Sequence, residues 1–307
     1  MRSLVQVSHS QDTPIESHLE KTVSYTYAEA LVENSLQNLL SCCFAGGLLD
    51  KTLEEGEALR EVVIFTALRP EMSPLKALLS SRDRLSRDIP IHIGQMEGKR
   101  VILVSSGVGG DRSLRAAELS YSRHNPDGVL STGFCGGLVP ELQPSDVVLS
   151  SWVVSEAAGS RLNMKQLVLG DKAVPLQTVL TGEGIRAYMG GFVCVSRPVV
   201  SPTEKRALAH RTGAMVVEME TFHLGEFFLS RNVPFLGMRT VVDGLNDRIP
   251  RLKSTMMMAG RPRPVDILRH LIFHPHGALD LWRLYENGRR AQVALRRSVG
   301  AVIRVWP

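Results

Sequence analysis

The stretch "DGVLSTGFCGGL", residues 127–138, runs from apolar and β-branched residues into a series of small ones. Apolar residues at consecutive positions suit a strand that is covered on both faces, because both sets of its side chains are then kept from water. In sheets of that kind, ligands bind outside the carboxyl ends of the strands. The stretch therefore predicts a buried strand of an α/β sheet, with candidate functional residues at its small-residue end.

Three further stretches share this pattern: residues 62–68, 100–110 and 233–247. Residues 113–124 and 202–213 lie between such stretches and show helical patterns. Residues 89–104 have the pattern of a hairpin that turns at Glu97 and Gly98. This alternation predicts an α/β fold in which helices flank a mixed, mainly parallel central sheet.

The composition is that of a globular protein: 44% of the 307 residues are hydrophobic and 22% are charged. The net charge of +5 is uneven, because residues 1–60 carry four Lys or Arg against nine Asp or Glu and residues 251–307 carry eleven against three. The basic end has few aromatic residues and no nucleic-acid-binding motif. We therefore expect solvated helix faces there and no nucleic-acid partner.

The four cysteines are Cys42, Cys43, Cys135 and Cys194, and no pair of them has C-x-x-C spacing. This pattern predicts reduced thiols, without a disulfide framework or a metal site. The N-terminus lacks the apolar core of a signal peptide, and no apolar run has membrane-spanning length. Together these features predict a cytoplasmic protein.

Carboxylates gather at the predicted strand ends. Glu71 follows the first apolar stretch, Asp243 lies near the end of the last, and "VVEMET" (residues 216–221) places Glu218 and Glu220 in an apolar segment. Burying a charge is costly unless the charge is paired or used. Because successive side chains of a strand alternate, we expect Glu218 to face away from Glu220 and to be structural.

Each carboxylate also has a simpler interpretation. Glu220 could cap the helix predicted after it, Glu71 could open a helix, and Asp243 could be a turn residue. Gly107, Gly109 and Gly110 do not complete a G-x-G-x-x-G fingerprint, since position 112 is Arg. A nicotinamide-dependent oxidoreductase is therefore only a weak alternative, and these glycines indicate a tight turn.

Five motifs together resemble the nucleoside phosphorylase and nucleosidase superfamily, and 5'-methylthioadenosine/S-adenosylhomocysteine nucleosidases in particular. They are "TALRPEM" (66–72), "SSGVGG" (105–110), "STGFCGGL" (131–138), "VVEMET" (216–221) and "MRTVVDG" (238–244). The resemblance covers about residues 61–250 and implies a three-layer sandwich with extra terminal helices. It also implies a homodimer, in which partner residues close the pocket, and no cofactor.

The resemblance implies a role for each candidate residue. Asp243 is the acid at N7 of a purine, Glu220 accepts both ribose hydroxyls, and Met219 packs on the sugar. Glu71 activates the attacking water, and Arg239 steadies that water and the Glu71 carboxylate. The implied reaction is cleavage of the N-glycosidic bond of an adenine nucleoside.

The resemblance also implies a pocket for the base, formed by Val200, Phe134, Cys135 and Gly136. Cys135 is expected to be a packing residue there and not a nucleophile. Phe134 and Val242 replace polar residues of the family, and Val200 stands where a purine-stacking aromatic is expected. These changes make a nucleoside-binding module without turnover an alternative.

The sequence favours water over phosphate as the nucleophile. Related phosphorylases hold phosphate with an arginine and a serine where this chain has Ser131 and Phe134, and with a further arginine where it has Glu71. A carboxylate at that place would repel phosphate. Arg69 and Arg112 remain alternative phosphate ligands, so phosphorolysis stays open.

The C-terminal segment is similar to the tail of hopanoid-associated phosphorylases, which remove adenine from a lipid-linked nucleoside. Trp282, Leu281 and Leu284, with nearby arginines, could contact a membrane surface, but a helical pair packed on the sheet is the preferred interpretation. The predicted organisation has three parts. Residues 1–60 form a helical or partly disordered extension, residues 61–250 the catalytic domain, and residues 251–307 a basic helical segment that completes it.

Overall fold

The structure is a computed structural model. It describes residues 61–80, 83–84, 89–124, 126–164, 175–249, 257–258, 261–262 and 275–306. The helix predicted within the N-terminal extension, with Cys42 and Cys43, lies outside these residues.

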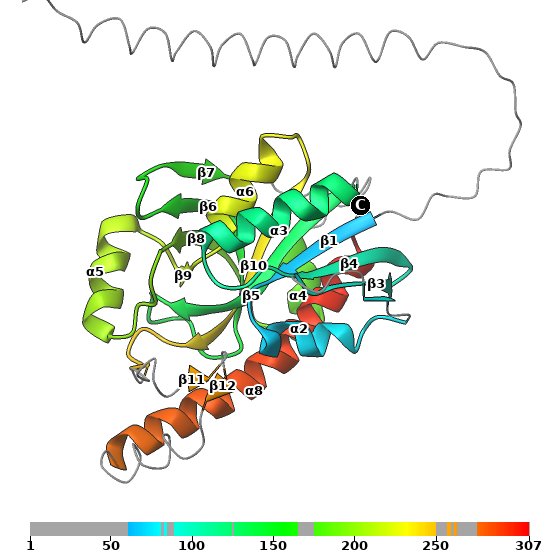
Figure 1. The fold of residues 1–307 in the computed structure, drawn as a ribbon. Coiled ribbons are helices and arrows are strands. Elements are labelled where there is room, and N and C mark those ends of the chain that lie inside the picture. The colour runs from blue at the N-terminus through cyan, green and yellow to red at the C-terminus, as the bar shows by residue number, and fades with distance from the viewer. Residues whose placement is uncertain are drawn as a thin grey trace, which may run out of the picture. The chain divides into compact units, whose positions relative to one another are not determined.

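One mixed sheet of ten strands forms the centre of the described fold (Figure 1). Its strands are β1 (Glu61–Thr66), β2 (Asp83–Arg84), β3 (Ile91–Met96), β4 (Lys99–Ser105), β5 (Gly128–Gly137), β6 (Val147–Ser155), β7 (Arg161–Asn163), β8 (Ala187–Cys194), β9 (Val216–Glu218) and β10 (Phe235–Asp243). The central strands β4, β1, β5 and β10 run parallel to one another, whereas β3 pairs antiparallel with β4 and β6 antiparallel with β10. The predicted mixed α/β sheet is confirmed.

Strand β5, which contains the opening stretch, pairs with three other strands. It pairs in parallel with β1 and β10, and its last two residues pair antiparallel with β9. The ends of β1, β5 and β10 therefore meet at one edge, beside the short strand β9. This edge is where the sequence predicts the functional residues.

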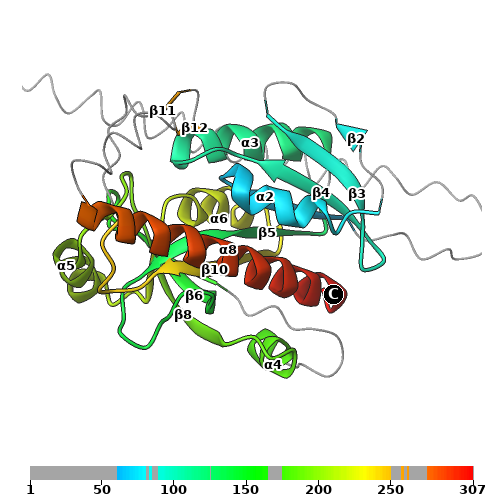
Figure 2. The same ribbon diagram turned by 90° about the horizontal axis from the view of Figure 1, so that it is seen from below.

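Helices cover both faces of the sheet, as Figures 1 and 2 show. They are α2 (Arg69–Lys76), α3 (Gly110–Arg123), α4 (Leu176–Gly182), α5 (Pro202–Thr212), α6 (Thr221–Leu229) and α8 (Pro275–Arg304). Helices α3 and α6 contact each other on one face, and α8 contacts α2 and α4 on the other. A second small sheet pairs β11 (Met257–Met258) with β12 (Arg261–Pro262).

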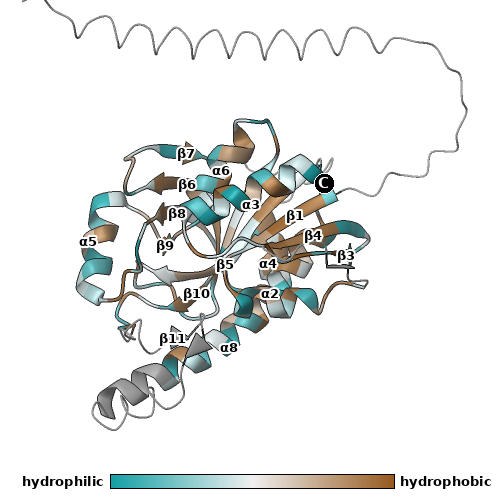
Figure 3. Cartoon of the chain, in the orientation of Figure 1, coloured by the Kyte–Doolittle hydropathy of each residue, from teal (hydrophilic) through white to brown (hydrophobic). Residues whose placement is uncertain are grey.

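The side chains of β1 alternate between the two faces of the sheet, and this explains why the sheet lies between two layers of helices. Val62 and Ile64 pack into a cluster with apolar residues of α2, α4 and α8, whereas Val63 and Phe65 pack into a second cluster with α3 and α6. Hydrophobic colour accordingly extends along the central strands, while the helices show both colours (Figure 3). Both faces of the sheet are therefore buried, as the continuous apolar runs predict.

The predicted turns also form. Glu97 and Gly98 link β3 to β4 with φ angles of 50° and 75°, the left-handed pair that a two-residue hairpin turn requires. Helix α5 begins after Ser201, whose hydroxyl accepts a hydrogen bond from the Glu204 N–H at 3.2 Å. It ends at Gly213, which has a left-handed φ of 68°.

Helix α8 is a single helix of 30 residues. Its C-terminal half buries Leu295, Val299 and Val302, and Trp306 follows it in the core. A Cβ atom at Gly128 would lie 2.6 Å from the Trp306 ring, so the glycine makes room for this tryptophan at the start of β5. Trp282, nearer the start of the helix, is 63% exposed. No helix in the described part of the chain is both long and apolar enough to cross a membrane.

The two tryptophans provide a matched test of this packing. Trp306→Ala is expected to lower the free energy of unfolding by about 3–5 kcal/mol, because it leaves a cavity against β5. Trp282→Ala should change it by no more than about 0.5 kcal/mol, since that side chain is largely solvated. Urea denaturation of both variants measures the difference, and equal effects would contradict the packing described here.

Candidate active site

A cleft of about 220 Å³ lies at the carboxyl ends of β1, β5, β9 and β10. It is lined by Ala67, Leu68, Glu71, Val108, Phe134, Cys135, Gly136, Val195, Pro198, Val199, Val217, Glu218, Met219, Glu220, Val242, Asp243 and Ile249. A larger cavity on the other side of the loop at Gly107 contains none of the predicted catalytic carboxylates. We therefore place the candidate active site in the smaller cleft.

Glu71 lies in the first turn of α2, where it is 3% exposed. Its Oε2 accepts hydrogen bonds from the N–H groups of Ala67 and Leu68, both at 2.8 Å, and its Oε1 accepts one from the Phe134 N–H at 2.9 Å. Burial raises the pKa of this carboxyl, against the opposing effect of the three N–H donors and of Arg239. Glu71 does open a helix, but its carboxylate also bridges that helix and β5 in the cleft.

Gly133 makes this position of Glu71 accessible. It has a φ of 151°, and a Cβ atom built on it would lie 2.7 Å from the Glu71 Oε1. A side chain at position 133 would therefore displace the carboxylate. This close approach requires a glycine at position 133, the first glycine of the "STGFCGGL" motif.

Arg239 is the central cation of the site and is 2% exposed. Its Nη2 donates to Glu218 Oε2 at 2.7 Å and to Ser131 Oγ at 3.1 Å, and lies 3.7 Å from Glu220 Oε2. The sequence predicted that Arg239 steadies Glu71. Its hydrogen bonds go to Glu218, Ser131 and the Met238 carbonyl, and it acts on Glu71 through its charge.

Glu218 differs from its prediction in orientation. Its Oε2 accepts hydrogen bonds from the Glu220 N–H at 3.0 Å, the Thr221 N–H at 2.7 Å and the Thr221 hydroxyl at 2.6 Å. Glu218 thus supplies the side-chain acceptor at the start of α6, where the Glu220 side chain makes no capping hydrogen bond. Because β9 ends at Glu218, strand alternation does not extend to Glu220, and both carboxylates approach Arg239.

Glu220 is 7% exposed and lines the cleft. Its Oε1 accepts a hydrogen bond from the Gly109 N–H at 3.0 Å. Burial and the neighbouring charge of Glu218 raise the pKa of this carboxyl to about 7, and Arg239 opposes the rise. Glu220 therefore changes its ionisation near neutral pH.

Asp243 ends β10 and is 3% exposed. Lys205 is a fully buried residue of α5, and its ammonium group donates a hydrogen bond to Asp243 Oδ2. The same ammonium group donates a second hydrogen bond to the Gly244 carbonyl, at 2.5 Å. Burial raises the pKa of Asp243, and the Lys205 charge opposes this rise. Asp243 is thus not merely a turn residue, because it has a buried cationic partner.

Lys205 was not among the predicted site residues. One signal was available, since Lys205 lies three residues before Leu208 and so on the face of α5 that is buried. A lysine on an apolar helix face needs a partner. The partner, 38 residues later in the chain, could not be identified from the sequence pattern.

The remaining predicted residues divide into two groups. Met219, Phe134, Cys135 and Gly136 line the cleft. Val200 does not: its carbonyl accepts a hydrogen bond from the Ile249 N–H at 3.0 Å, and the cleft is lined instead by the preceding residues, Pro198 and Val199.

Two further features bear on the chemistry. Burial raises the pKa of the Cys135 thiol well above its usual value, which suits a packing residue and not a nucleophile. Within the described ranges, no group of three or more His, Cys, Asp or Glu side chains is placed to hold a metal ion. The carboxyl groups that line the cleft belong to Glu71, Glu218, Glu220 and Asp243, and they are the candidate acid and base groups.

The fold and the cleft agree with comparisons to known proteins. The family profile described as "Phosphorylase superfamily" matches residues 61–258, and the chain belongs to this family of enzymes. The family resemblance predicted from the five motifs is thereby confirmed.

Individual relatives are nucleosidases. The chain is 26% identical to a 5'-methylthioadenosine/S-adenosylhomocysteine nucleosidase of Shewanella loihica over 69% of this chain and 100% of that protein. The nucleosidase of the same name from Neisseria meningitidis, in complex with methylthio-immucillin-A, superposes with a TM-score of 0.62 at 19% identity over 80% of this chain and 99% of the other. Futalosine hydrolase of Helicobacter pylori superposes with a TM-score of 0.59 at 17% identity over 78% and 97%.

The raised pKa of Glu220 leads to a test of stability. The folded protein binds this proton more tightly than the unfolded chain, whose glutamate has the ordinary pKa of 4.5. Through this group, the free energy of unfolding therefore falls as the pH rises from about 4.5 to about 7 and stays reduced above that. Glu220→Gln is expected to stabilise the protein by about 1–3 kcal/mol at pH 8, with little effect at pH 4.

Urea denaturation at the two pH values measures this effect. Glu226→Gln is the matched control, because Glu226 is an exposed glutamate of the adjacent helix α6. A Glu220→Gln variant that is less stable than the parent at pH 8 would contradict the assignment of a destabilised carboxylate.

Proposed function

We propose that the protein hydrolyses the N-glycosidic bond of an adenine nucleoside. The observation that carries this proposal is the convergence of Glu71, Glu220 and Asp243 on one cleft, each from a different strand end and each with different partners. Such a set separates the three tasks of the reaction: protonating the leaving base, holding the sugar and activating water.

The base lies at the Asp243 end of the cleft. Because Oδ2 of Asp243 accepts a hydrogen bond from the Lys205 ammonium, Oδ1 is the oxygen that interacts with N7 of the purine. Gly136 keeps room beside this carboxylate, since a Cβ atom there would lie 3.1 Å from Oδ2. Burial favours the protonated acid, which donates its proton to N7. The pocket wall is formed by Pro198 and Val199, so an aliphatic surface takes the place of a stacking aromatic ring.

The ribose lies against Glu220 and Met219. An ionised carboxylate only accepts hydrogen bonds, so Glu220 can receive one from each of the two ribose hydroxyls. Its backbone partner at Gly109 leaves the second oxygen, Oε2, and further lone pairs for the sugar. The ionised form is needed for this task, and it predominates above about pH 7.

The bond-breaking step follows from these positions. The bond between C1' and the purine nitrogen breaks with its electron pair going to the purine, while Asp243 transfers a proton to N7. A water oxygen bonds to C1', and Glu71 takes the proton that this water loses. Burial raises the pKa of Glu71 above its ordinary value, which makes this carboxylate a stronger base.

The charge of the cleft favours water over phosphate. Glu71, Glu218 and Glu220 are buried close to one cation, Arg239, whose Nη2 is already bound to Glu218 and Ser131. An arriving phosphate would meet carboxylates without a free buried arginine in the described part of the cleft. Phosphorolysis of the same bond is the runner-up reaction.

Several finer points belong to this proposal as predictions. The protein is expected to be a cytoplasmic homodimer, and the exposed apolar residues Leu68 and Val108 at the cleft are a surface that a second copy could cover. For the alternative of contact with a lipid surface, Trp282 is 63% exposed and Leu284 is half-buried, whereas the side chain of Leu281 lies outside the described residues; Tyr285 is a further residue of α8 that is 63% exposed.

The reaction can be tested on a panel of purine and pyrimidine nucleosides with and without inorganic phosphate. We expect adenine release from 5'-methylthioadenosine in both conditions, with free sugar as the second product. Chromatography of bases and sugars measures both products. Strict dependence on phosphate, with a sugar 1-phosphate as product, would replace hydrolysis by phosphorolysis, and binding of the nucleosides without base release would indicate a module without turnover.

The proposed acid has its own test. Asp243→Asn keeps the shape of the side chain but cannot donate an acid proton, and it is expected to lower kcat by about 10²–10⁴-fold. Asp111→Asn is the matched control, since Asp111 is an exposed carboxylate in the first turn of α3. Turnover of Asp243→Asn at the parent rate would reject Asp243 as the acid.

A further inference from the structure

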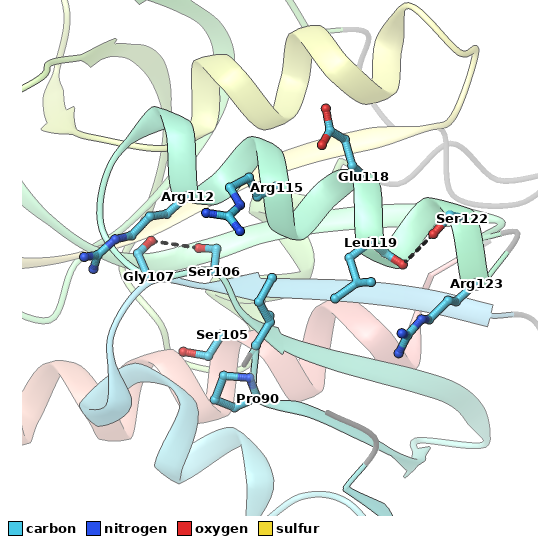
Figure 4. Close-up of a pocket in the computed structure, with 11 residues that line it drawn as sticks. Pro90, Ser105, Ser106, Gly107, Arg112, Arg115, Glu118, Leu119, Ser122 and Arg123 are labelled. Carbon is cyan, nitrogen blue, oxygen red and sulfur yellow. Dashed lines mark hydrogen bonds between the residues drawn. The ribbon is translucent and has the colours of Figure 1, made fainter. Parts of the chain in front are cut away.

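A second cavity, of about 800 Å³, lies between α3 and the adjoining parts of β3 and β4 (Figure 4). One face of α3 supplies the arginines Arg112, Arg115 and Arg123 to its lining, together with a single carboxylate, Glu118. Pro90, Ser105 and Ser106 lie across from this helix. The cavity is therefore predominantly positive, with hydroxyl groups on its opposite wall.

These three arginines differ from the paired arginines of the molecule. Arg186, Arg197 and Arg211 each form an ion pair with a carboxylate. Among the residues that the structure describes, the exposed side chains of Arg112, Arg115 and Arg123 have neither a hydrogen bond nor an ion pair with a protein group, so their guanidinium groups retain the capacity for an anionic ligand.

Arg112 is also placed against the electrostatic preference of a helix. It lies in the first turn of α3, where the helix dipole disfavours a cation. Its side chain folds over Gly107, because a Cβ atom at Gly107 would lie 3.0 Å from the Arg112 Cδ. A cation kept at this position, beside a glycine with a left-handed φ of 80°, increases the positive potential at this end of the cavity.

The loop between β4 and α3 separates this cavity from the candidate active site. Gly107 lines the cavity, Val108 lines the cleft, and the Gly109 N–H holds Glu220. With the base proposed at Asp243 and the ribose hydroxyls at Glu220, we take the 5' end of the sugar to face Val108 and Leu68, two further residues of the cleft lining. These side chains are 38% and 41% exposed, so the cleft opens there.

We infer that the substrate carries an anionic group on its 5' substituent and that Arg112 and Arg115 bind this group in the second cavity. The inference rests on the proposed function, since it assumes a nucleoside in the cleft. A carboxylate or a phosphate can accept paired hydrogen bonds from a guanidinium, so either satisfies this chemistry. The substituent must be long enough to pass Val108 and reach beyond Gly107.

The experiment compares two nucleosides that differ only in charge: 5'-(carboxypropylthio)-5'-deoxyadenosine and its primary amide. The parent protein is expected to show a kcat/KM at least about tenfold higher for the acid, because hydrogen bonds to ionised groups are the stronger ones. In the double variant Arg112→Gln/Arg115→Gln this ratio should fall to about one, while kcat/KM for neutral 5'-methylthioadenosine stays within about twofold.

Arg296→Gln is the matched control, since Arg296 is an exposed arginine of α8 outside both pockets, and it should preserve the acid-to-amide ratio. A ratio near one in the parent protein, or a high ratio that the double variant retains, would overturn the inference while base release continues. Absence of base release from all three nucleosides would instead reject the proposed function.

A further arm separates an attached anion from a free one. Inorganic phosphate is added during turnover of 5'-methylthioadenosine. We expect no change in rate that depends on Arg112 and Arg115. A phosphate effect that the double variant abolishes would show that the cavity takes a free anion, and it would overturn the assignment to the 5' substituent.

Discussion

The buried pair of Arg239 and Glu218 is the interaction on which the rest of the site depends. Both side chains are almost fully removed from water, so loss of either would leave an uncompensated charge in the core. Arg239 comes from β10 and also binds Ser131 of β5, while Glu218 ends β9 and accepts the first N–H groups of α6. One ion pair thereby joins three strands and a helix, and it determines where Glu220 stands.

Around this pair, three carboxylates are buried in three different environments. Glu71 has three backbone N–H donors, Glu220 has one N–H and a neighbouring carboxylate, and Asp243 has the ammonium of Lys205. Burial raises the pKa of each, but the opposing partner differs from one to the next. Groups of the same chemical type can therefore serve as base, hydrogen-bond acceptor and acid within a single cleft.

The loop that follows β4 connects this cleft with the arginine-lined cavity. Its glycines adopt left-handed φ angles, which bring a backbone N–H to Glu220 on one side and leave room for Arg112 on the other. One short segment thus borders both the candidate active site and the second cavity.

The sequence by itself determined the elements and the edge of the sheet at which they meet. Apolar runs marked β1, β4, β5 and β10, paired turn residues marked the hairpin, and the motifs located Glu71, Glu220 and Asp243, because these features depend on residues close together in the chain. Only the tertiary structure decided the partners. Lys205 binds Asp243 and Arg239 binds Glu218, and these contacts join residues that are far apart in the sequence. Val199 lines the cleft in place of Val200, because a shift of one position along an extended chain moves a side chain to the opposite side.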